Sequence, residues 1–225
     1  MKKNETKSKK SSTVQTSGRP REKDVSLRLD KILGIAAQVF LDEGFDRASV
    51  SAIARLAGAS KETLYARFAT KEELFETVIT RKTEILLKKF SRVLVSDQRI
   101  EKVLEVYGLN LLNLMLGPEM QRLSRTVVSA APHFPELAER FWKLCPDREQ
   151  QQLAEYLKEQ QLANNLAAVD VRKSAELFFS LCLGQFLLHA QLRVRRPPSL
   201  AARKEHIHEV VRMFLAAYGG AGFKA

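Results

Sequence analysis

The segment from Ser49 to Phe68 constrains the fold most, because it predicts two short helices separated by a two-residue turn. Apolar side chains recur at helical spacing in its first half, at Val50, Ile53, Ala54 and Ala57. Ser49 stands before this pattern as a candidate N-cap, and Gly58 follows it as a stop. Ser60 then caps a second helix that we expect to run from Lys61 to about Phe68.

Further helices flank this pair. Upstream, Ile32, Ala36 and Phe40 recur every four residues and form one apolar stripe that ends at Gly44. Downstream, the segment 70–73 has the sequence of a capping box and opens a longer helix. Two short amphipathic helices joined by a glycine-containing turn, and braced by a preceding helix, form a helix-turn-helix unit. The second helix of such a unit can present its N-terminal polar side chains to base edges.

The pattern stays helical from Lys71 to the end of the chain. The expected helices are 74–90, 103–116, 120–131, 137–166 with a kink or break at Cys145 and Pro146, 175–190 and 207–218. The helix 175–190 also has Leu177, Leu181 and Leu188 on its other side. A helix that is apolar on two faces is buried on both, so we expect it to pack in its own core and against a second subunit.

These patterns predict an all-α protein with a small N-terminal helical domain and a larger helical body. We expect a disordered basic tail at 1–24, a three-helix helix-turn-helix domain at 25–71 and the body at 72–225. A body of this size argues against a purely architectural DNA-binding protein, since DNA binding alone needs far less chain. That alternative, a DNA-binding protein that responds to no ligand, is kept for comparison.

Positive charge is densest at the N-terminal end. Residues 1–24 contain eight Lys or Arg against three acidic residues, and residues 25–71 contain seven against five. Such a distribution suits a polyanion, and double-stranded DNA is the expected partner. Within the tail, Arg19 and Arg21 flank a proline, and an extended segment of this kind can lie in a narrow minor groove. A plain basic linker explains the same residues equally well.

Other functional classes find little support. The cysteines, Cys145 and Cys182, lack metal-ligand spacing, and His206 and His208 are two residues apart, on different faces of a helix. Neither a nucleophile with its base nor a glycine-rich phosphate loop is evident, so we expect no enzyme, no cofactor and no metal. The apolar stretch 175–190 is shorter than a membrane span and contains polar residues, which favours a cytoplasmic protein without a membrane partner.

The segments 49–68 and 71–75, together with the pattern 32–44, resemble the DNA-binding domain of the TetR family. The segment 135–142 and the later 175–178 are similar to AefR-like C-terminal domains. This resemblance implies a homodimer joined mainly by the last two long helices, and a ligand cavity within each body. It also implies that ligand binding moves the fourth helix and changes the spacing of the two DNA-reading heads.

The resemblance also implies which residues contact DNA. The recognition-helix positions are Lys61, Thr63, Tyr65 and Arg67, and the phosphate-contacting positions are Ser49, Ser51 and Lys71. Ser49 and Ser60 are each either a cap alone or a contact as well. Lys71 lies at a helix N-terminus, where a cation is otherwise unfavourable, and this suggests an external anion.

A small apolar or aromatic molecule is the expected effector. Candidate pocket groups are polar or aromatic residues among apolar ones, namely Tyr107, Asn110, Arg125, Trp142 and Gln185.

Overall fold

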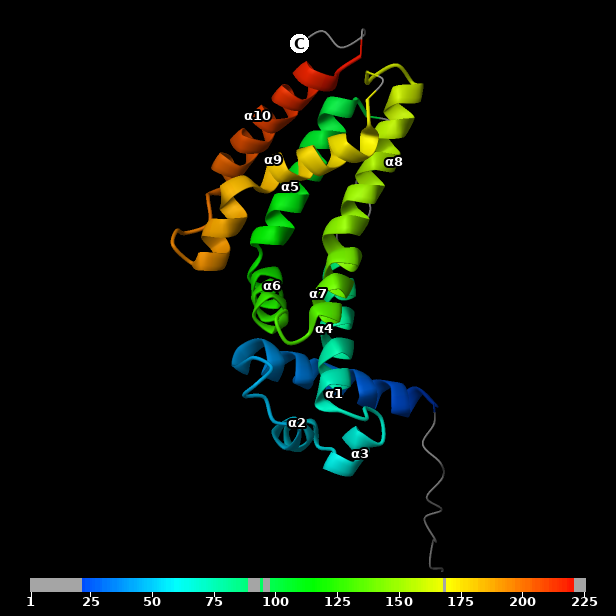
Figure 1. Ribbon diagram of the computed structural model, residues 1–225, viewed down its shortest axis with the longest axis vertical. Helices are drawn as coiled ribbons and strands as arrows, with labels where there is room; N and C mark the ends of the chain where they lie inside the picture. Colours follow the sequence, from blue (N-terminus) through cyan, green and yellow to red (C-terminus); the bar gives the residue numbers. More distant parts are fainter. Residues whose placement is uncertain (1–21, 89–93, 95–97, 168, 221–225) are drawn as a thin grey trace, which may run out of the picture.

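The computed structural model describes residues 22–88, 94, 98–167 and 169–220, and in this part of the chain helices dominate. The described residues form no strand, and a single isolated bridge joins Leu166 to Gly219. The all-α class predicted from the sequence is therefore confirmed. Figure 1 shows a small helical head at one end and a longer helical body extending from it.

The head consists of α1 (Glu22–Glu43), α2 (Val50–Ala57) and α3 (Lys61–Tyr65). Helix α1 begins at Glu22, so residues 22–24 are helical and not part of the disordered tail expected from the sequence. Residues 1–21 lie outside the described residues. Gly58 ends α2 in the left-handed conformation at φ 67°, as the turn requires.

Helix α4 (Lys71–Leu87) connects the head to the body. Its N-terminus is capped by Thr70, whose Oγ1 accepts from the Glu73 amide at 3.1 Å, while the Glu73 carboxylate accepts from the Ala69 amide at 2.7 Å. An aromatic cluster then ties α4 to its surroundings. The Phe45 ring lies 4.9 Å from Phe75 and 4.5 Å from Phe134, measured between centroids. The head is thus packed directly against the body.

The first part of the body contains α5 (Ile100–Leu116), α6 (Pro118–Ala130), α7 (Pro135–Trp142) and α8 (Arg148–Leu162). A short π-helical turn, η1 (Lys143–Asp147), joins α7 to α8. It contains Pro146, which has no amide hydrogen to donate to the helical ladder. The irregularity predicted at Cys145 and Pro146 is therefore present, as a π-helical turn within one long helical segment.

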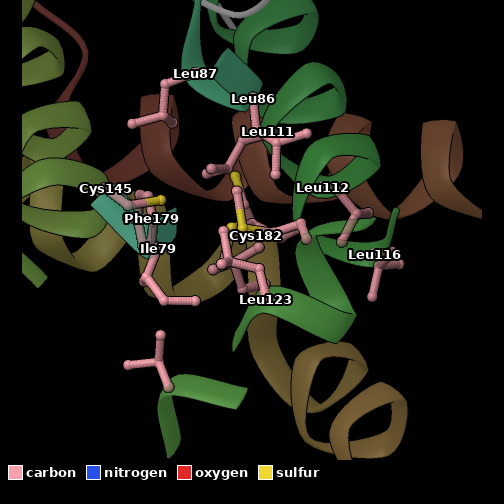
Figure 2. Packing of buried hydrophobic residues seen from close by; sticks show 14 of the residues in the cluster. Ile79, Leu86, Leu87, Leu111, Leu112, Leu116, Leu123, Cys145, Phe179 and Cys182 are labelled. Atoms are coloured by element: carbon pink, nitrogen blue, oxygen red, sulfur yellow. The ribbon is translucent and has the colours of Figure 1, made fainter. Parts of the chain in front are cut away.

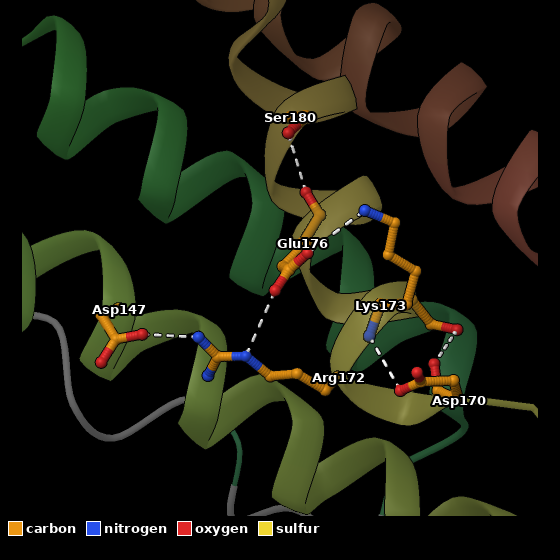
Figure 3. A network of polar contacts seen from close by, with 7 residues as sticks. Asp147, Asp170, Arg172, Lys173, Glu176 and Ser180 are labelled. Carbon is orange, nitrogen blue, oxygen red and sulfur yellow. Dashed lines mark hydrogen bonds and ion pairs between the residues drawn. The ribbon is translucent and has the colours of Figure 1, made fainter.

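The last two helices are α9 (Val171–Leu192) and α10 (Leu200–Tyr218). Gly184 interrupts α9 with φ 42° and ψ −140°, and Figure 1 shows the resulting bend. The N-terminal end of α9 is fixed by ionic contacts shown in Figure 3. Arg172 donates to Asp147 of η1 at 2.5 Å and lies 3.4 Å from Glu176.

The core of the body forms where α4, α5, α6 and α9 meet. Figure 2 shows part of it, including Ile79, Leu111, Leu123 and Phe179 around the Cys182 thiol. Cys145 and Cys182 are both buried and unbonded. Burial raises the pKa of the Cys145 thiol to about 12 and that of Cys182 well above its ordinary value. Both thiols are therefore neutral and act as small apolar core residues.

Two glycines of the head provide a matched pair for testing the turn. A Cβ built at Gly34 or Gly58 would meet no described atom within 4 Å, but only Gly58 has a positive φ. We expect Gly58→Ala to destabilise the protein by about 1 kcal/mol and Gly34→Ala, inside α1, to stabilise it by about 0.5–1 kcal/mol. Urea unfolding of both variants measures this. Equal effects would show that backbone conformation does not distinguish the two sites.

Candidate nucleic-acid interface

Helix α3 and the turn that follows it expose polar side chains on an apolar support. Leu64 is 1% exposed and Phe68 is 6% exposed, so both anchor the segment in the head. Ser60 caps α3, since its Oγ accepts from the Thr63 amide at 3.1 Å. The four recognition-helix positions predicted from the sequence are all exposed, namely Lys61, Thr63, Tyr65 and Arg67. The structure thus places these side chains on the surface of one short segment, 61–67.

The helix is shorter than the expected 61–68. It ends at Tyr65, and Ala66 and Arg67 continue as a hydrogen-bonded turn in which Phe68 donates to the Leu64 carbonyl at 2.8 Å. Thr70 must already be extended to cap α4, so the chain has to leave the helical conformation before it. Arg67 therefore extends from a turn beside the helix and not from the helix itself.

Ser49 and Ser51 lie at the N-terminus of α2 and are exposed. Ser49 Oγ accepts from the Ala52 amide at 3.4 Å, which is long for a hydrogen bond and makes it a weak cap. Its hydroxyl can therefore take a second partner without loss to the helix. Free amide groups at the start of α2 suit phosphate for the same reason that they suit other anions.

Lys71 has internal partners that the sequence did not reveal. Its ammonium group donates to the Asp46 carbonyl at 3.2 Å and lies 4.5 Å from the centre of the Phe45 ring. These contacts explain a lysine at the start of α4 without an external anion. Lys61, in contrast, has only a distant ring neighbour, with its Nζ 5.6 Å from the centre of the Tyr65 ring.

Glu62 is the one acidic residue of α3. Hydrogen bonding to backbone at the helix N-terminus, and then to Ser60, lowers the pKa of its carboxyl group. Glu62 therefore stabilises the start of α3.

Sequence analysis overlooked two basic residues near the predicted contacts. Arg28 of α1 lines an open hollow together with Thr63 and Arg67 of the α3 region. Arg55 is exposed in the last turn of α2. A count of every exposed basic residue on the helices, in addition to the family positions, would have included both. Arg19 and Arg21 lie outside the described residues.

The five candidate pocket residues lie in separate surroundings. Tyr107 is buried and donates to the Glu149 carbonyl at 3.1 Å, and Asn110 is half-buried on the same helix. Trp142 is 53% exposed at the end of α7. Arg125 and Gln185 line two neighbouring hollows at the connection between α9 and α10. The structure does not bring the five together around one space.

Polar groups in the body interior escaped the sequence analysis. Both carboxylate oxygens of Glu149 and the hydroxyls of Thr80 and Tyr156 are buried and have no hydrogen-bond partner in the described structure. Burial raises the pKa of Glu149 to about 7 and that of Tyr156 to about 12. Glu149, Leu153 and Tyr156 recur at helical spacing, which would have identified this inner face of α8.

Helices α9 and α10 expose an apolar surface. Leu177, Leu181 and Leu188 of α9 are 39%, 40% and 56% exposed, and Met213 of α10 is 56% exposed.

By length and composition, α9 is the one described helix that could also cross a membrane. Among the described residues, no group of three or more His, Cys, Asp or Glu is placed to hold a metal ion. The His206 ring nitrogen Nε2 lies 3.1 Å from the Leu181 carbonyl of α9, whereas His208 Nδ1 lies 2.9 Å from a Glu105 carboxylate oxygen. The two histidines therefore point in different directions.

Curated relatives are similar to a part of the chain. The HTH-type transcriptional regulator QacR of Staphylococcus aureus is 40% identical over 50 residues, which are 22% of this chain and 27% of QacR. The HTH-type transcriptional activator FasR of Mycolicibacterium smegmatis is 32% identical over 84 residues, 36% of this chain and 38% of FasR. The chain therefore spans well under half the length of these relatives.

Solved structures are similar over nearly the whole fold. A TetR-family regulator from Mesorhizobium loti has a TM-score of 0.77 at 24% identity, covering 86% of this chain and 98% of that one. The flavonoid-responsive regulator FrrA has a TM-score of 0.77 at 28% identity, covering 88% of this chain and 100% of FrrA.

Two family models match the chain itself. The model for bacterial regulatory proteins of the tetR family matches residues 32–78, and the model for the AefR-like transcriptional repressor C-terminal domain matches residues 102–220. Together they cover the helix-turn-helix head and most of the body. The chain therefore belongs to the TetR family of transcriptional regulators, with an AefR-like C-terminal domain.

Proposed function

We propose that this transcriptional regulator is a homodimeric repressor that binds a pseudo-palindromic operator and leaves it when a small molecule binds the body. The observation that carries the proposal is the set of exposed polar side chains on α3 and the turn after it, anchored in the head by the buried Leu64 and Phe68. The head, 25–71, reads DNA, and the body, 72–225, dimerises and senses the ligand. Such a protein works in the cytoplasm, where the chromosome is.

Within the head, Lys61 and Arg67 donate to guanine or to phosphate, and the Thr63 methyl group suits a thymine methyl. Tyr65 offers its hydroxyl to phosphate, and Ser49, Ser51 and Ser60 add hydroxyl groups around two helix N-termini. Lys71 acts from its place beside Phe45, either as a phosphate contact or as a brace for the turn. Basic tail residues Arg19 and Arg21 would add minor-groove contacts.

Dimerisation follows from the exposed leucines of α9. Leu177 and Leu181 lie one turn apart on α9 before the bend at Gly184, and Leu188 lies after the bend. Helix α10 packs on α9 and exposes Met213. A large apolar surface on a soluble protein marks an interface. A second copy that covers this surface also places two heads on one DNA duplex, as a symmetric operator requires.

The effector is proposed to be a small apolar or aromatic molecule. The similarity to a flavonoid-responsive regulator at 28% identity supports this class. The candidate contacts are Tyr107, Asn110, Arg125, Trp142 and Gln185, of which Arg125 and Gln185 already border open hollows. The alternative, a DNA-binding protein that responds to no ligand, leaves the buried unpartnered groups of α8 without a role.

Selection of binding sites from randomised duplex DNA tests the proposal. We expect an inverted repeat, and against this operator Lys61→Ala and Tyr65→Ala should each weaken binding about tenfold or more, as loss of a base or phosphate contact predicts. Fluorescence anisotropy at fixed salt gives the affinities, and thermal melts show whether the variants remain folded.

Lys158→Ala is a matched control, because Lys158 is an exposed lysine in the C-terminal half of α8, a helix that extends away from the head in Figure 1. It should bind the operator as the parent protein does. Normal binding by both Lys61→Ala and Tyr65→Ala would contradict the role of α3, and a featureless selected pool would contradict a symmetric operator.

A further inference from the structure

An open hollow of about 500 Å³ lies between the start of α6, the end of α9 and the loop that follows α9. Four arginines line it, Arg125 from α6 and Arg193, Arg195 and Arg196 from the loop. Apolar side chains, among them Leu116 and Val194, form the rest of its wall. Its volume falls in the range of small-molecule sites.

The four arginines are electrostatically uncompensated. None of their guanidinium groups has an ion pair or a hydrogen bond within the described part of the chain, and no Asp or Glu lines the hollow. Arg122, the next arginine on α6, is already paired with Asp42 at 2.8 Å. Desolvation, followed by the charges of Arg193 and Arg122, lowers the pKa of the Arg125 guanidinium. An anion in the hollow would relieve this repulsion.

The fold holds both sides of the hollow in place. Arg193 adopts a left-handed conformation at φ 55° and caps α9 by donating its amide to the His189 carbonyl. Two residues earlier, Gln191 Nε2 lies 3.2 Å from Ser124 Oγ of α6. The first contact sets where the loop leaves α9, and the second joins this end of α9 to α6, without using the charged groups of the loop arginines.

We propose that this hollow binds an amphipathic oxyanion, with a carboxylate or phosphate head held by the arginines and an apolar tail against the wall. Guanidinium groups match both heads, because each offers paired N–H donors to two oxygens. This inference deepens the proposed function by naming the charge of the effector, and only its regulatory part rests on that function. Coupling to DNA would pass through α6, whose Arg122 contacts Asp42 of α1 in the head.

Thermal unfolding of the full chain with chosen probes tests binding without DNA. Decanoate and monodecyl phosphate share the proposed chemistry and differ in the head, so the stronger of the two identifies the preferred source. We expect at least one of them to raise Tm by several degrees at saturating concentration. Acetate and inorganic phosphate lack the tail, and decyltrimethylammonium reverses the charge, so none of these three should raise Tm.

Arg125→Gln, and Arg195→Gln combined with Arg196→Gln, should weaken binding of the active probe about tenfold or more by calorimetry. Neither variant should be less stable than the parent without ligand, since each removes like charge. Arg99→Gln is the matched control and should bind normally, because Arg99 is exposed and precedes α5 at the end opposite Leu116. Equal binding by all variants, equal stabilisation by the tailless anions, or no stabilisation by either probe would overturn the proposal.

Oligomeric state and operator binding complete the test. If the arginine variants dissociate the dimer in light scattering, the hollow belongs to the subunit interface and the ligand proposal is wrong. If the probe binds but leaves operator affinity unchanged, the proposed regulatory role of the hollow is overturned. Failure to select any operator would instead overturn the proposed function, and the thermal shifts would still decide whether the hollow binds an oxyanion.

Discussion

Leu181→Asp should convert the protein to a monomer and remove high-affinity operator binding. Leu181 lies on the outer side of α9, 40% exposed in the single chain, and its carbonyl contacts His206 of α10 at 3.1 Å. It is therefore beside the junction of the two helices proposed to form the interface. In a symmetric dimer each substitution occurs twice, so two aspartates would enter one apolar contact.

The expected loss is large because an unpaired carboxylate buried at an interface costs about 3–5 kcal/mol. The dimer dissociation constant should rise at least about 100-fold. Operator binding should fall with it, since a monomer engages one half-site only. Light scattering over a concentration series measures the first effect, and anisotropy on the selected operator measures the second.

Leu162→Asp is the matched control for this prediction. Leu162 is 79% exposed at the end of α8, so the same chemical change falls on an exposed leucine outside the α9 and α10 surface. It should remain dimeric and bind DNA. A dimeric Leu181→Asp that retains operator affinity would place the subunit contact elsewhere.

Local sequence signals predicted the head well. Ser49, Ser60 and Thr70 all cap the helices that they precede, and Gly58 ends α2 in the left-handed conformation. These are interactions within four residues of sequence, which a pattern can reveal directly. The end of α3 was predicted too late because Thr70, the N-cap of α4, requires extended backbone and ends the helix early. A sequence pattern shows that two such signals are present, but not which of them is stronger.

Long-range contacts account for what sequence analysis missed. Nothing within α9 distinguishes Gly184 from a tolerated helical glycine, and its positive φ is visible only in the folded chain. From the sequence, Lys71 was expected to bind an external anion. In the fold, its ammonium group contacts the Asp46 carbonyl and the Phe45 ring, which are 25 and 26 residues earlier in the chain. The arginines of the α9–α10 loop line one hollow with Arg125 of α6, which only the folded chain reveals. Such pairings depend on tertiary packing and not on periodicity.

Glu149→Met should stabilise the protein at pH 8 by about 3 kcal/mol. In the folded protein, burial raises the pKa of Glu149 to about 7, against an ordinary value of 4.5. The folded state therefore retains its proton more strongly than the unfolded state does between these values. Stability contributed by the protonated carboxyl is complete below pH 4.5 and is lost as the pH rises through 7. A shift of this size corresponds to about 3 kcal/mol.

Methionine is suited to this site because it fills a similar volume without a charge. The hydrogen bond from Tyr107 goes to the backbone carbonyl of residue 149 and survives the change. Both buried carboxylate oxygens lack partners, so no described hydrogen bond is lost. Urea unfolding at several pH values gives the difference in stability between the parent and the variant. That difference should grow from pH 5 to pH 8, since only the parent carries the titrating group.

Glu155→Met provides the control on the same helix. Glu155 is exposed and has no ion pair in the described structure, so its replacement should change stability by less than about 0.5 kcal/mol at any of these pH values. A constant difference between the parent and Glu149→Met across the series would mean that Glu149 does not change its protonation over this range. A destabilised variant would mean that the Glu149 carboxylate has a favourable partner in the folded protein. A buried water or cation beside the inner face of α8 would be that partner.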